Sequence, residues 1–336
     1  MEGIGAQMIA IRDPRFELLA APTPLQRLHR IEATLAARPL HVKRDDLMGI
    51  GMGGNKLRSL EFWIGAARER NADVLLVAGG ASSNQCRLTA AAAAIAGLDC
   101  IVFHNAGEGE RSRQASFLNR VFGAEVRFLG DVGEQERAER VARAATELSR
   151  SGRSPYIVGD ATVGALGYVL AAAELHEQSW SGEADIRHVF LPGSMGTTEA
   201  GFIFGNALLG SPFEVHLVSV EYSRAELAAR VTRIYDDLRR HTGFDVPDMD
   251  RLPVRYHMDH LGAGYGLPTM ASEQAILRFA RTEGVVLEHV YTGKTFAAFL
   301  DLTQSDALPP GEAACVIHTG GTASLFSQFD LFRTLA

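Results

Sequence analysis

The residues with the clearest chemical potential lie in a glycine turn in the first fifth of the chain. The run Gly53-Gly54-Asn55-Lys56 places a lysine after two glycines and directly before an amphipathic pattern. Glycines permit positive φ angles and a close backbone approach to a bound group. If a cleft lowers the pKa of the Lys56 amine, that amine becomes a nucleophile able to form a Schiff base. A solvated lysine at a helix start explains the same residues, and this turn alone leaves both interpretations open.

Two further glycine turns offer sites for anions. The segment 79–85, Gly-Gly-Ala-Ser-Ser-Asn-Gln, follows an apolar run and opens a helical pattern. Its free N–H groups suit a carboxylate or a phosphate, although plain helix capping by Ser83 or Asn84 is an equal alternative. The segment 192–201 alternates glycines with hydroxyl residues and predicts a phosphate cradle made mostly of backbone N–H groups. It lacks both the P-loop lysine and the dinucleotide-binding spacing.

Two segments in the last fifth of the chain offer groups that complete a site. Thr319 stands beside Gly320 and Gly321 after an apolar run, where its hydroxyl can contact a flat ring from the edge. Tyr291 precedes another glycine turn and a helix, and its phenol is a candidate for proton transfer. A tight turn and simple aromatic packing are the alternatives. Lys294 is a second candidate amine, ranked below Lys56 because a lysine inside a helix usually faces water.

The composition restricts the class of protein. The chain has 336 residues, 46% hydrophobic and 22% charged, with a net charge of −7. This is ordinary globular composition, and the absence of a basic tract argues against nucleic acid and anionic membrane as partners. The first residues show no secretory signal pattern, and the three cysteines form neither a disulfide framework nor a close metal-ligand pair. We therefore expect a cytoplasmic protein and assign no metal site from the sequence.

Short apolar runs alternate with helical patterns over most of the chain, which predicts an α/β protein with parallel-rich sheets flanked by helices. The expected strands are 73–78, 100–104, 125–129, 155–158, 188–191, 214–220 and 315–318. The expected helices are 57–70, 84–96, 111–122, 134–150, 164–178, 197–208, 224–240 and 272–282. Residues 242–268 are rich in Asp, His, Pro and Gly and are expected to be irregular. In such sheets ligands bind where strand C-termini meet helix N-termini, and the glycine turns lie at these places.

The segment 151–155 is the nearest thing to a hinge. We expect a small, inserted α/β lobe over residues 58–158, and a large cofactor-binding α/β lobe made of residues 1–57 and 159–336.

Taken together, a Schiff-base lysine, a phosphate cradle and a carboxylate-binding helix start indicate pyridoxal 5'-phosphate (PLP) and an amino acid. The chain resembles the PLP enzymes of fold type II, the tryptophan synthase β-like class. Within it, the chain is similar to the family of 1-aminocyclopropane-1-carboxylate (ACC) deaminase and D-cysteine desulfhydrase. Besides the lysine turn, the resemblance rests on Pro22-Thr23-Pro24-Leu25, Lys43-Arg44-Asp45-Asp46-Leu47, Ser83-Asn84-Gln85-Cys86-Arg87, Gly262-Ala263-Gly264-Tyr265-Gly266, Tyr291-Thr292-Gly293-Lys294 and His318-Thr319-Gly320-Gly321.

The resemblance implies a role for each turn. Lys56 binds the cofactor covalently and, once freed, is the base at the substrate Cα. The residues that bind the cofactor besides Lys56 are Asn84, Gly193, Ser194, Met195, Gly196, Thr197 and Thr319. The residues that bind or act on the substrate are Ser83, Asn84, Gln85, Tyr291 and Thr292, with Ser83 and Tyr291 counted as catalytic together with Lys56. A homodimer is expected from the family.

The resemblance also indicates a reaction. A neutral Thr319 hydroxyl at the pyridine nitrogen makes the ring a weaker electron sink than a carboxylate would, which suits elimination. ACC deaminases carry a glutamate where this chain has Thr292, so the expected activity is that of a D-cysteine desulfhydrase: α,β-elimination to pyruvate, ammonia and sulfide.

Several alternatives remain open. L-Cysteate sulfo-lyase, ACC deaminase and a γ-replacement enzyme use the same scaffold, and a non-catalytic protein that binds an amino acid or PLP is the alternative from another class. The sequence does not fix the substrate or its stereochemistry. It also leaves the roles of Arg87 and His289 open. Either could contact a sulfonate; otherwise Arg87 forms an ion pair and His289 is a loop histidine without a role in the site.

Overall fold

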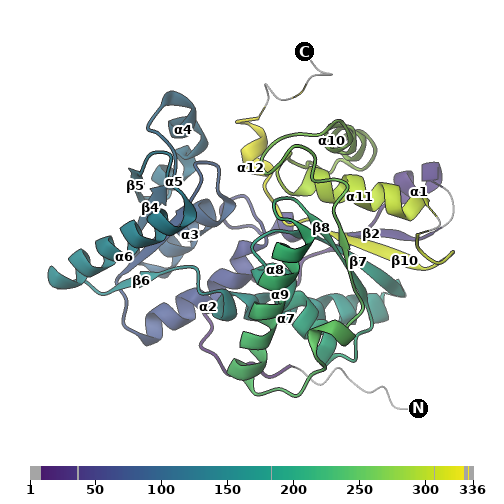
Figure 1. The fold of residues 1–336 in the computed structure, drawn as a ribbon, viewed down its shortest axis with the longest axis horizontal. Coiled ribbons are helices and arrows are strands. Elements are labelled where there is room, and N and C mark those ends of the chain that lie inside the picture. Colours follow the sequence, from purple (N-terminus) through teal and green to yellow (C-terminus); the bar gives the residue numbers. More distant parts are fainter. Residues whose placement is uncertain (1–8, 36–37, 183, 306, 329–331, 333–336) are drawn as a thin grey trace.

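The computed structural model describes residues 9–35, 38–182, 184–305, 307–328 and 332. The first residues, on which the absence of a signal pattern was judged, lie outside this part. Two sheets organise the described chain, and Figure 1 shows the smaller one with its helices to one side of the larger one. The expected α/β class with parallel-rich sheets is confirmed. No helix in these ranges is long and apolar enough to span a membrane.

The large sheet has six strands in the order β1-β2-β10-β7-β8-β9. All neighbouring strands are parallel except β1 and β2, which are antiparallel. The strands are β1 (Leu25–Arg27), β2 (Leu40–Lys43), β7 (Ile186–Gly193), β8 (Glu214–Ser219), β9 (Val254–His257) and β10 (Ala313–Ile317). Because the strands are parallel, β7 and β10 end at the same edge, so the turns after Gly193 and Ile317 meet there.

Helices cover both faces of this sheet. Figure 1 shows α7, α8 and α9 gathered on one side and α10 and α11 on the other, and each group shares a separate apolar core with the sheet. Their bounds are α1 (His29–Leu35), α7 (Ala161–Ser181), α8 (Thr197–Leu208), α9 (Arg224–Thr242), α10 (Met270–Glu283), α11 (Thr292–Gln304) and α12 (Thr322–Leu325). Burial on both faces explains why the interior strand β10, Ala-Ala-Cys-Val-Ile, is continuously apolar instead of alternating.

The small sheet is entirely parallel, in the order β5-β4-β3-β6. Helices α2 and α3 pack on one face and α6 on the other. The elements are α2 (Lys56–Glu69), β3 (Val74–Gly79), α3 (Asn84–Ala96), β4 (Asp99–His104), α4 (Glu110–Ala115), α5 (Phe117–Val121), β5 (Glu125–Phe128), α6 (Glu134–Arg150) and β6 (Pro155–Ile157).

The structure corrects the sequence-based elements in two places. The helix expected over 111–122 is interrupted at Ser116, whose hydroxyl donates to the carbonyl of Ser112 at 2.8 Å and so competes with the helical ladder. The segment 242–268, expected to be irregular, contains a short 3-10 helix, η2 (Met249–Arg251), and the edge strand β9. Strands β1 and β2 and helix α1 were not predicted, because elements of only three to seven residues carry little periodic signal.

A buried ionic network fixes the start of α2, where Lys56 lies. The Arg58 guanidinium binds Asp45 at 2.9 Å and Glu174 of α7 at 2.9 Å, and the Tyr168 hydroxyl donates to Asp45 at 2.6 Å. The short 3-10 helix η1 (Asp45–Leu47) carries this aspartate. Arg58, with opposite charges on both sides, has a pKa raised well above its usual value, whereas the pKa of Asp45 is lowered by the Arg58 charge despite its burial. The network therefore joins the lysine turn to both sheets.

Candidate active site

The turn before Lys56 requires its glycines. Gly53 and Gly54 have φ angles of +69° and +133°. A Cβ on Gly53 would lie 2.0 Å from the Asp46 carbonyl oxygen, so no other residue fits. The Gly54 N–H donates to the Asp45 carbonyl at 3.0 Å. The turn is thereby held against η1, and Lys56 begins α2 from a fixed position.

The Lys56 amine is available for chemistry. The side chain is partly buried, and Nζ has no hydrogen-bond partner among the described residues. Burial lowers the pKa of the Lys56 amine, and the Glu199 carboxylate opposes that shift. A larger neutral fraction near pH 7 follows, which is what a nucleophile and a base require. The partly buried side chain is covered more than that of a fully solvated lysine would be.

The turn after β10 lies directly against the lysine turn. The Asn55 N–H donates to the Thr319 carbonyl at 3.0 Å, and Gly54 and Gly320 form an antiparallel bridge. A Cβ on Gly320 would lie 2.6 Å from the Gly54 Cα, so the backbones touch. The ring of His318 accepts a hydrogen bond from the Gly320 N–H at 3.1 Å and is 2.9 Å from the Val286 carbonyl through its other nitrogen. These bonds require the neutral ring, consistent with a pKa that burial lowers.

The loop after β7 also contacts the lysine turn. The Asn55 amide donates to the Thr198 hydroxyl at 2.9 Å. Gly196 has a φ of +93° and starts α8, so the loop N–H groups converge at a helix N-terminus. The buried carboxylate of Glu199 occupies this position, accepting from the N–H of Ser194 at 2.5 Å and of Gly196 at 3.3 Å. Burial raises the pKa of Glu199 in spite of these bonds.

The start of α3 is tied to the lysine turn through Arg87. The Arg87 guanidinium donates from Nη2 to the Gly53 carbonyl at 3.3 Å and to the Asn84 side-chain oxygen at 3.0 Å. Its Nη1 is buried without a partner among the described residues, and burial lowers the Arg87 pKa to about 10. The Ser83 hydroxyl accepts from the Cys86 N–H at 3.3 Å, so it caps α3 as the alternative interpretation proposed. Its own proton remains available to a ligand.

Tyr291 pairs with a second tyrosine. The hydroxyls of Tyr265 and Tyr291 are 2.5 Å apart, and their rings meet edge to face. Burial raises the pKa of Tyr265 to about 12 and that of Tyr291 well above its usual range. Both phenols are therefore protonated at neutral pH. Because one hydroxyl donates to the other, one proton of the pair remains free to point elsewhere.

Two buried charged residues hold this pair in place. The Glu288 carboxylate accepts from the N–H groups of Val290, Tyr291 and Thr292 at 2.6–2.8 Å. A Cβ on Gly321 would lie 2.6 Å from the Glu288 Cγ, so this carboxylate also contacts the turn after Thr319. The Lys294 amine donates to the carbonyls of Leu261 and Gly264, both at 2.8 Å, and so fixes the loop that carries Tyr265.

One expectation needs correction. Lys294 was expected to face water, but it is fully buried, because the carbonyls of the preceding loop solvate its amine inside the protein. His289 does lie in a turn between α10 and α11, but its ring is fully covered and packs at a tilt against Phe332 with centroids 4.7 Å apart, and burial lowers its pKa.

The structure thus brings three turns into direct contact with the lysine turn, and the Glu288 side chain joins the Tyr291 segment to the turn after Thr319. Sequence reasoning did not identify Asn55, Thr198, Glu199, Tyr265 and Glu288 as site residues. For Asn55 the available signal was a polar side chain next to Lys56 in a glycine turn, and for Tyr265 it was an aromatic residue between glycines. The Gln85 side chain is partly buried and makes no polar contact with another described residue, and Met195 is 41% exposed.

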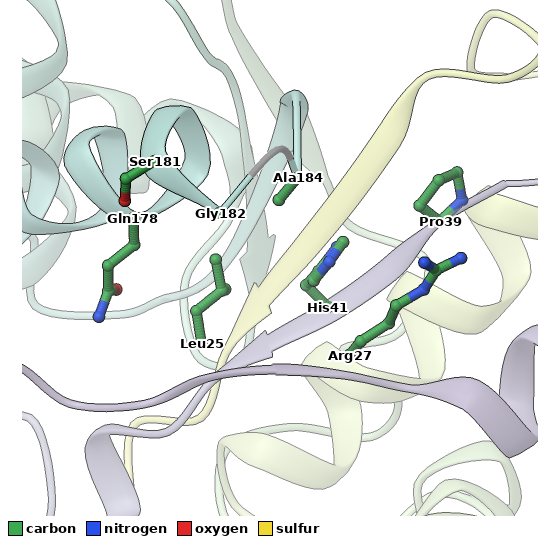
Figure 2. A pocket seen from close by; sticks show the side chains of 8 residues that line it. All are labelled: Leu25, Arg27, Pro39, His41, Gln178, Ser181, Gly182 and Ala184. Carbon is green, nitrogen blue, oxygen red and sulfur yellow. The ribbon is translucent and has the colours of Figure 1, made fainter.

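A large hollow elsewhere in the molecule does not belong to this site. Figure 2 shows a cavity of about 430 Å³ lined by residues such as Leu25, Pro39 and Gln178. It lies where β2 begins and α7 ends, whereas the turns follow the C-termini of β7 and β10. None of its lining residues is among the expected site residues.

The residues present fit PLP. A phosphate needs converging N–H groups, and those of Ser194 and Gly196 at the start of α8 converge on one acceptor, the Glu199 carboxyl group. An aldehyde needs an amine with lowered pKa, and Lys56 provides it. Phosphate binding through the same N–H groups requires the Glu199 side chain to turn away or to share them.

An α/β fold with a lysine of lowered pKa and an anion-binding loop at one sheet edge defines a cofactor-dependent enzyme of the lysine Schiff-base class. The chain belongs to the family of pyridoxal-phosphate dependent enzymes, whose model matches residues 16–320. Its cofactor is PLP, and the expected membership of fold type II is confirmed.

Similar proteins place the chain within the family. It is 33% identical to the D-cysteine desulfhydrases of Serratia proteamaculans and Salmonella choleraesuis, over 94% of this chain and 96% of each relative. A crystal structure of an ACC deaminase homologue is 31% identical, covers 97% of both chains and superposes with a TM-score of 0.87. O-Ureido-L-serine synthase, 17% identical with a TM-score of 0.70, shares the fold.

Proposed function

We propose that this protein catalyses the α,β-elimination of D-cysteine to pyruvate, ammonia and sulfide. The observation that carries the proposal is the pair of protonated phenols, Tyr265 and Tyr291, held at one side of the lysine turn. A leaving sulfur needs a proton or a hydrogen bond, and a neutral phenol provides one. The similarity to two D-cysteine desulfhydrases over nearly the full length supports the same substrate.

Each turn then has a task. When bound, PLP supplies the electron sink that makes elimination possible. Lys56 holds the cofactor and, as a neutral amine, takes the proton from the substrate Cα. Ser83, Gln85 and the N-terminus of α3 would bind the substrate carboxylate, Asn84 would hold the cofactor ring, and Thr319 would bind the ring nitrogen. The N–H groups of the loop 193–197 bind the phosphate.

Tyr291 moves the second proton. Its hydroxyl donates to the leaving sulfur, while Tyr265 donates to the Tyr291 oxygen, so that the Tyr291 proton is free to point to the substrate. Thr292 shapes the same wall, and its N–H is held by Glu288 at 2.8 Å.

A substrate with a second anionic group is the other candidate. The buried, unpartnered Nη1 of Arg87 favours it, because a sulfonate would satisfy that donor. L-Cysteate fits this description, and its elimination releases sulfite. We also infer a homodimer and a cytoplasmic location, on the family resemblance.

The test compares products and cofactor retention. We expect yellow purified protein, borohydride fixation of the cofactor on Lys56, and pyruvate release from D-cysteine faster than from L-cysteate, D-serine and 3-chloro-D-alanine. ACC is assayed by 2-oxobutyrate. The Lys56→Ala variant should lose both fixation and activity, and a fully active, colourless variant would overturn the proposal. Light scattering tests the homodimer.

A further inference from the structure

A cluster of histidines lies on the large sheet away from the active-site turns. His188 lies near the start of β7, His216 in β8 and His257 at the end of β9, on three neighbouring strands. In the register of β7 and β8, His188 is opposite Glu214 and Phe190 is opposite His216. Side chains two residues apart on a strand share a face, so His188, Phe190, Glu214 and His216 lie on one face of the sheet. Phe190 stacks on the His216 ring at 4.4 Å between centroids, and also packs on Phe299 of α11, which identifies the face that α11 covers.

Three donor atoms in this cluster converge. His188 Nδ1 is 3.1 Å from His216 Nε2 and 3.5 Å from Glu214 Oε2, and the three donors lie within 4.8 Å of one another. Zinc binds histidine nitrogen and carboxylate oxygen at about 2.0–2.2 Å, which places tetrahedral ligands about 3.3–3.5 Å apart. The separations of 3.1 Å and 3.5 Å around His188 Nδ1 are close to those values.

Each of these three residues also has a partner on its outer side. His188 Nε2 is 2.7 Å from Glu312 Oε2, and His216 Nδ1 is 2.9 Å from His257 Nε2. The other oxygen of Glu214 accepts from Arg255. Metal-binding histidines and carboxylates regularly have such outer partners, which fix the ring tautomer and the side-chain orientation.

Burial and charge suit a cation. His188 and His216 are 2% and 0% exposed, whereas Glu214 and Glu312 reach the solvent and leave a path inward. Burial and the neighbouring rings lower the His216 pKa to about 2, so this ring is neutral and able to coordinate.

We propose that His188, His216 and Glu214 bind one divalent transition-metal ion of the Zn²⁺ type, with water in the fourth position. Two imidazoles and one carboxylate are a donor set that zinc accepts. The ion joins β7 to β8 at the N-terminal end of the sheet, and Glu312 extends the link to the segment that enters β10. Its role is therefore structural, since the active-site turns lie at the opposite ends of these strands. Sequence spacing does not reveal the site, because two strands contribute the ligands.

The test uses the full-length protein after borohydride reduction, which fixes the cofactor, and after removal of metals with a chelator. Added Co²⁺ should bind at one ion per chain and give visible d–d absorption at wavelengths longer than those of the cofactor. Zn²⁺ should displace it and raise the thermal unfolding midpoint. Glu214→Gln and His188→Gln should lose the absorption, whereas Glu312→Gln should weaken affinity about 10- to 100-fold.

His241→Gln is the matched control, because His241 also pairs with a carboxylate, Asp13 at 2.6 Å, but belongs to no such cluster. It should bind Co²⁺ like the parent protein, and circular dichroism should show that every variant is folded. The proposal is overturned if the folded parent protein binds no Co²⁺ or Zn²⁺, or if Glu214→Gln and His188→Gln bind them unchanged. The first result would identify the cluster as a hydrogen-bonded histidine chain from Glu312 to His257.

Discussion

Glu199 is the site residue that departs most from what a phosphate-binding loop needs. A carboxylate held by the N–H groups of Ser194 and Gly196 competes with a phosphate for the same donors. It also raises the pKa of Lys56, against the effect of burial. One side chain thus acts on both ends of the bound cofactor.

Replacing Glu199 with glutamine should tighten cofactor binding. The amide oxygen still accepts an N–H bond, but the negative charge next to the phosphate is gone, so we expect about tenfold higher PLP affinity, or about 1.4 kcal/mol. Because burial raises the Glu199 pKa, the parent carboxyl is protonated more readily on acidification, and the difference should grow as pH rises. PLP titration of the apoprotein measures both effects.

The control for this change is Glu226→Gln, which alters an exposed carboxylate that caps α9. It should leave PLP affinity unchanged. Equal affinities for Glu199→Gln and the parent protein at all pH values would contradict the competition.

Tyr291→Phe tests the proton transfer to sulfur. We expect kcat on D-cysteine to fall about 10²- to 10⁴-fold, the usual range for losing a general acid. Cofactor absorbance should persist, because the phenol does not hold the cofactor. Tyr235→Phe in α9, which removes a hydroxyl that donates to the Pro247 carbonyl, should keep full activity. Unchanged kcat in Tyr291→Phe would exclude the phenol as the proton donor.

At the scale of elements, the buried ionic network around Arg58 fixes the position of the start of α2 and therefore of Lys56. Asp45 is bound by Arg58 and Tyr168 through its side chain, and its carbonyl accepts the Gly54 N–H. A substitution that displaces η1 is therefore expected to displace the lysine turn as well.

Arg58→Met should destabilise the protein by about 3–5 kcal/mol, because it leaves the carboxylates of Asp45 and Glu174 without that partner. Urea unfolding measures the loss, and PLP should dissociate at lower urea than in the parent protein. Arg153→Met removes exposed ion pairs to Asp73 and Asp99 and should cost about 0–1 kcal/mol. Similar losses for the two variants would refute the role of burial.

The glycine turns could be predicted from the sequence, because adjacent glycines indicate a backbone with positive φ angles that other residues rarely adopt. That these turns lie close together also followed from the sequence, because the C-termini of parallel strands lie at the same edge of a sheet. Contacts made by single side chains were not predictable: Lys294 has the sequence context of an exposed helical lysine, and only the folded loop supplies the carbonyls of Leu261 and Gly264. The edge strand β9 escaped because Asp, His and Pro around it resemble a loop.

At the scale of the whole molecule, several histidines are buried in the neutral state. Burial lowers the pKa of His41, His104, His257 and His318, besides His216. The unfolded chain protonates these rings near their ordinary pKa of 6.5, while the folded chain resists protonation. Stability should therefore fall as the pH drops below about 6.5, because the unfolded state binds more protons.

Unfolding free energies measured between pH 8 and pH 5 in the presence of a chelator should show this decline. A single ring contributes a slope of at most about 1.4 kcal/mol per pH unit. His41→Gln should reduce the slope, because one such ring is lost. A flat profile from pH 8 to pH 5 would contradict the neutral burial of these rings.

We propose that residues 58–158 and the two flanking segments form separate lobes, as their separate sheets suggest. Limited proteolysis within 151–155 would release fragments divided at that boundary.

The contact between Gly54 and Gly320 has a consequence for synthesis of the chain. A ribosome adds about 5–20 residues per second, and domains made first fold first. The lysine turn emerges early, but the turn that closes on it is translated much later, after both sheets have most of their strands. Until then the Lys56 amine lacks that neighbour, so the nascent protein can capture its cofactor in the finished geometry only once β10 and the turn after it have been made.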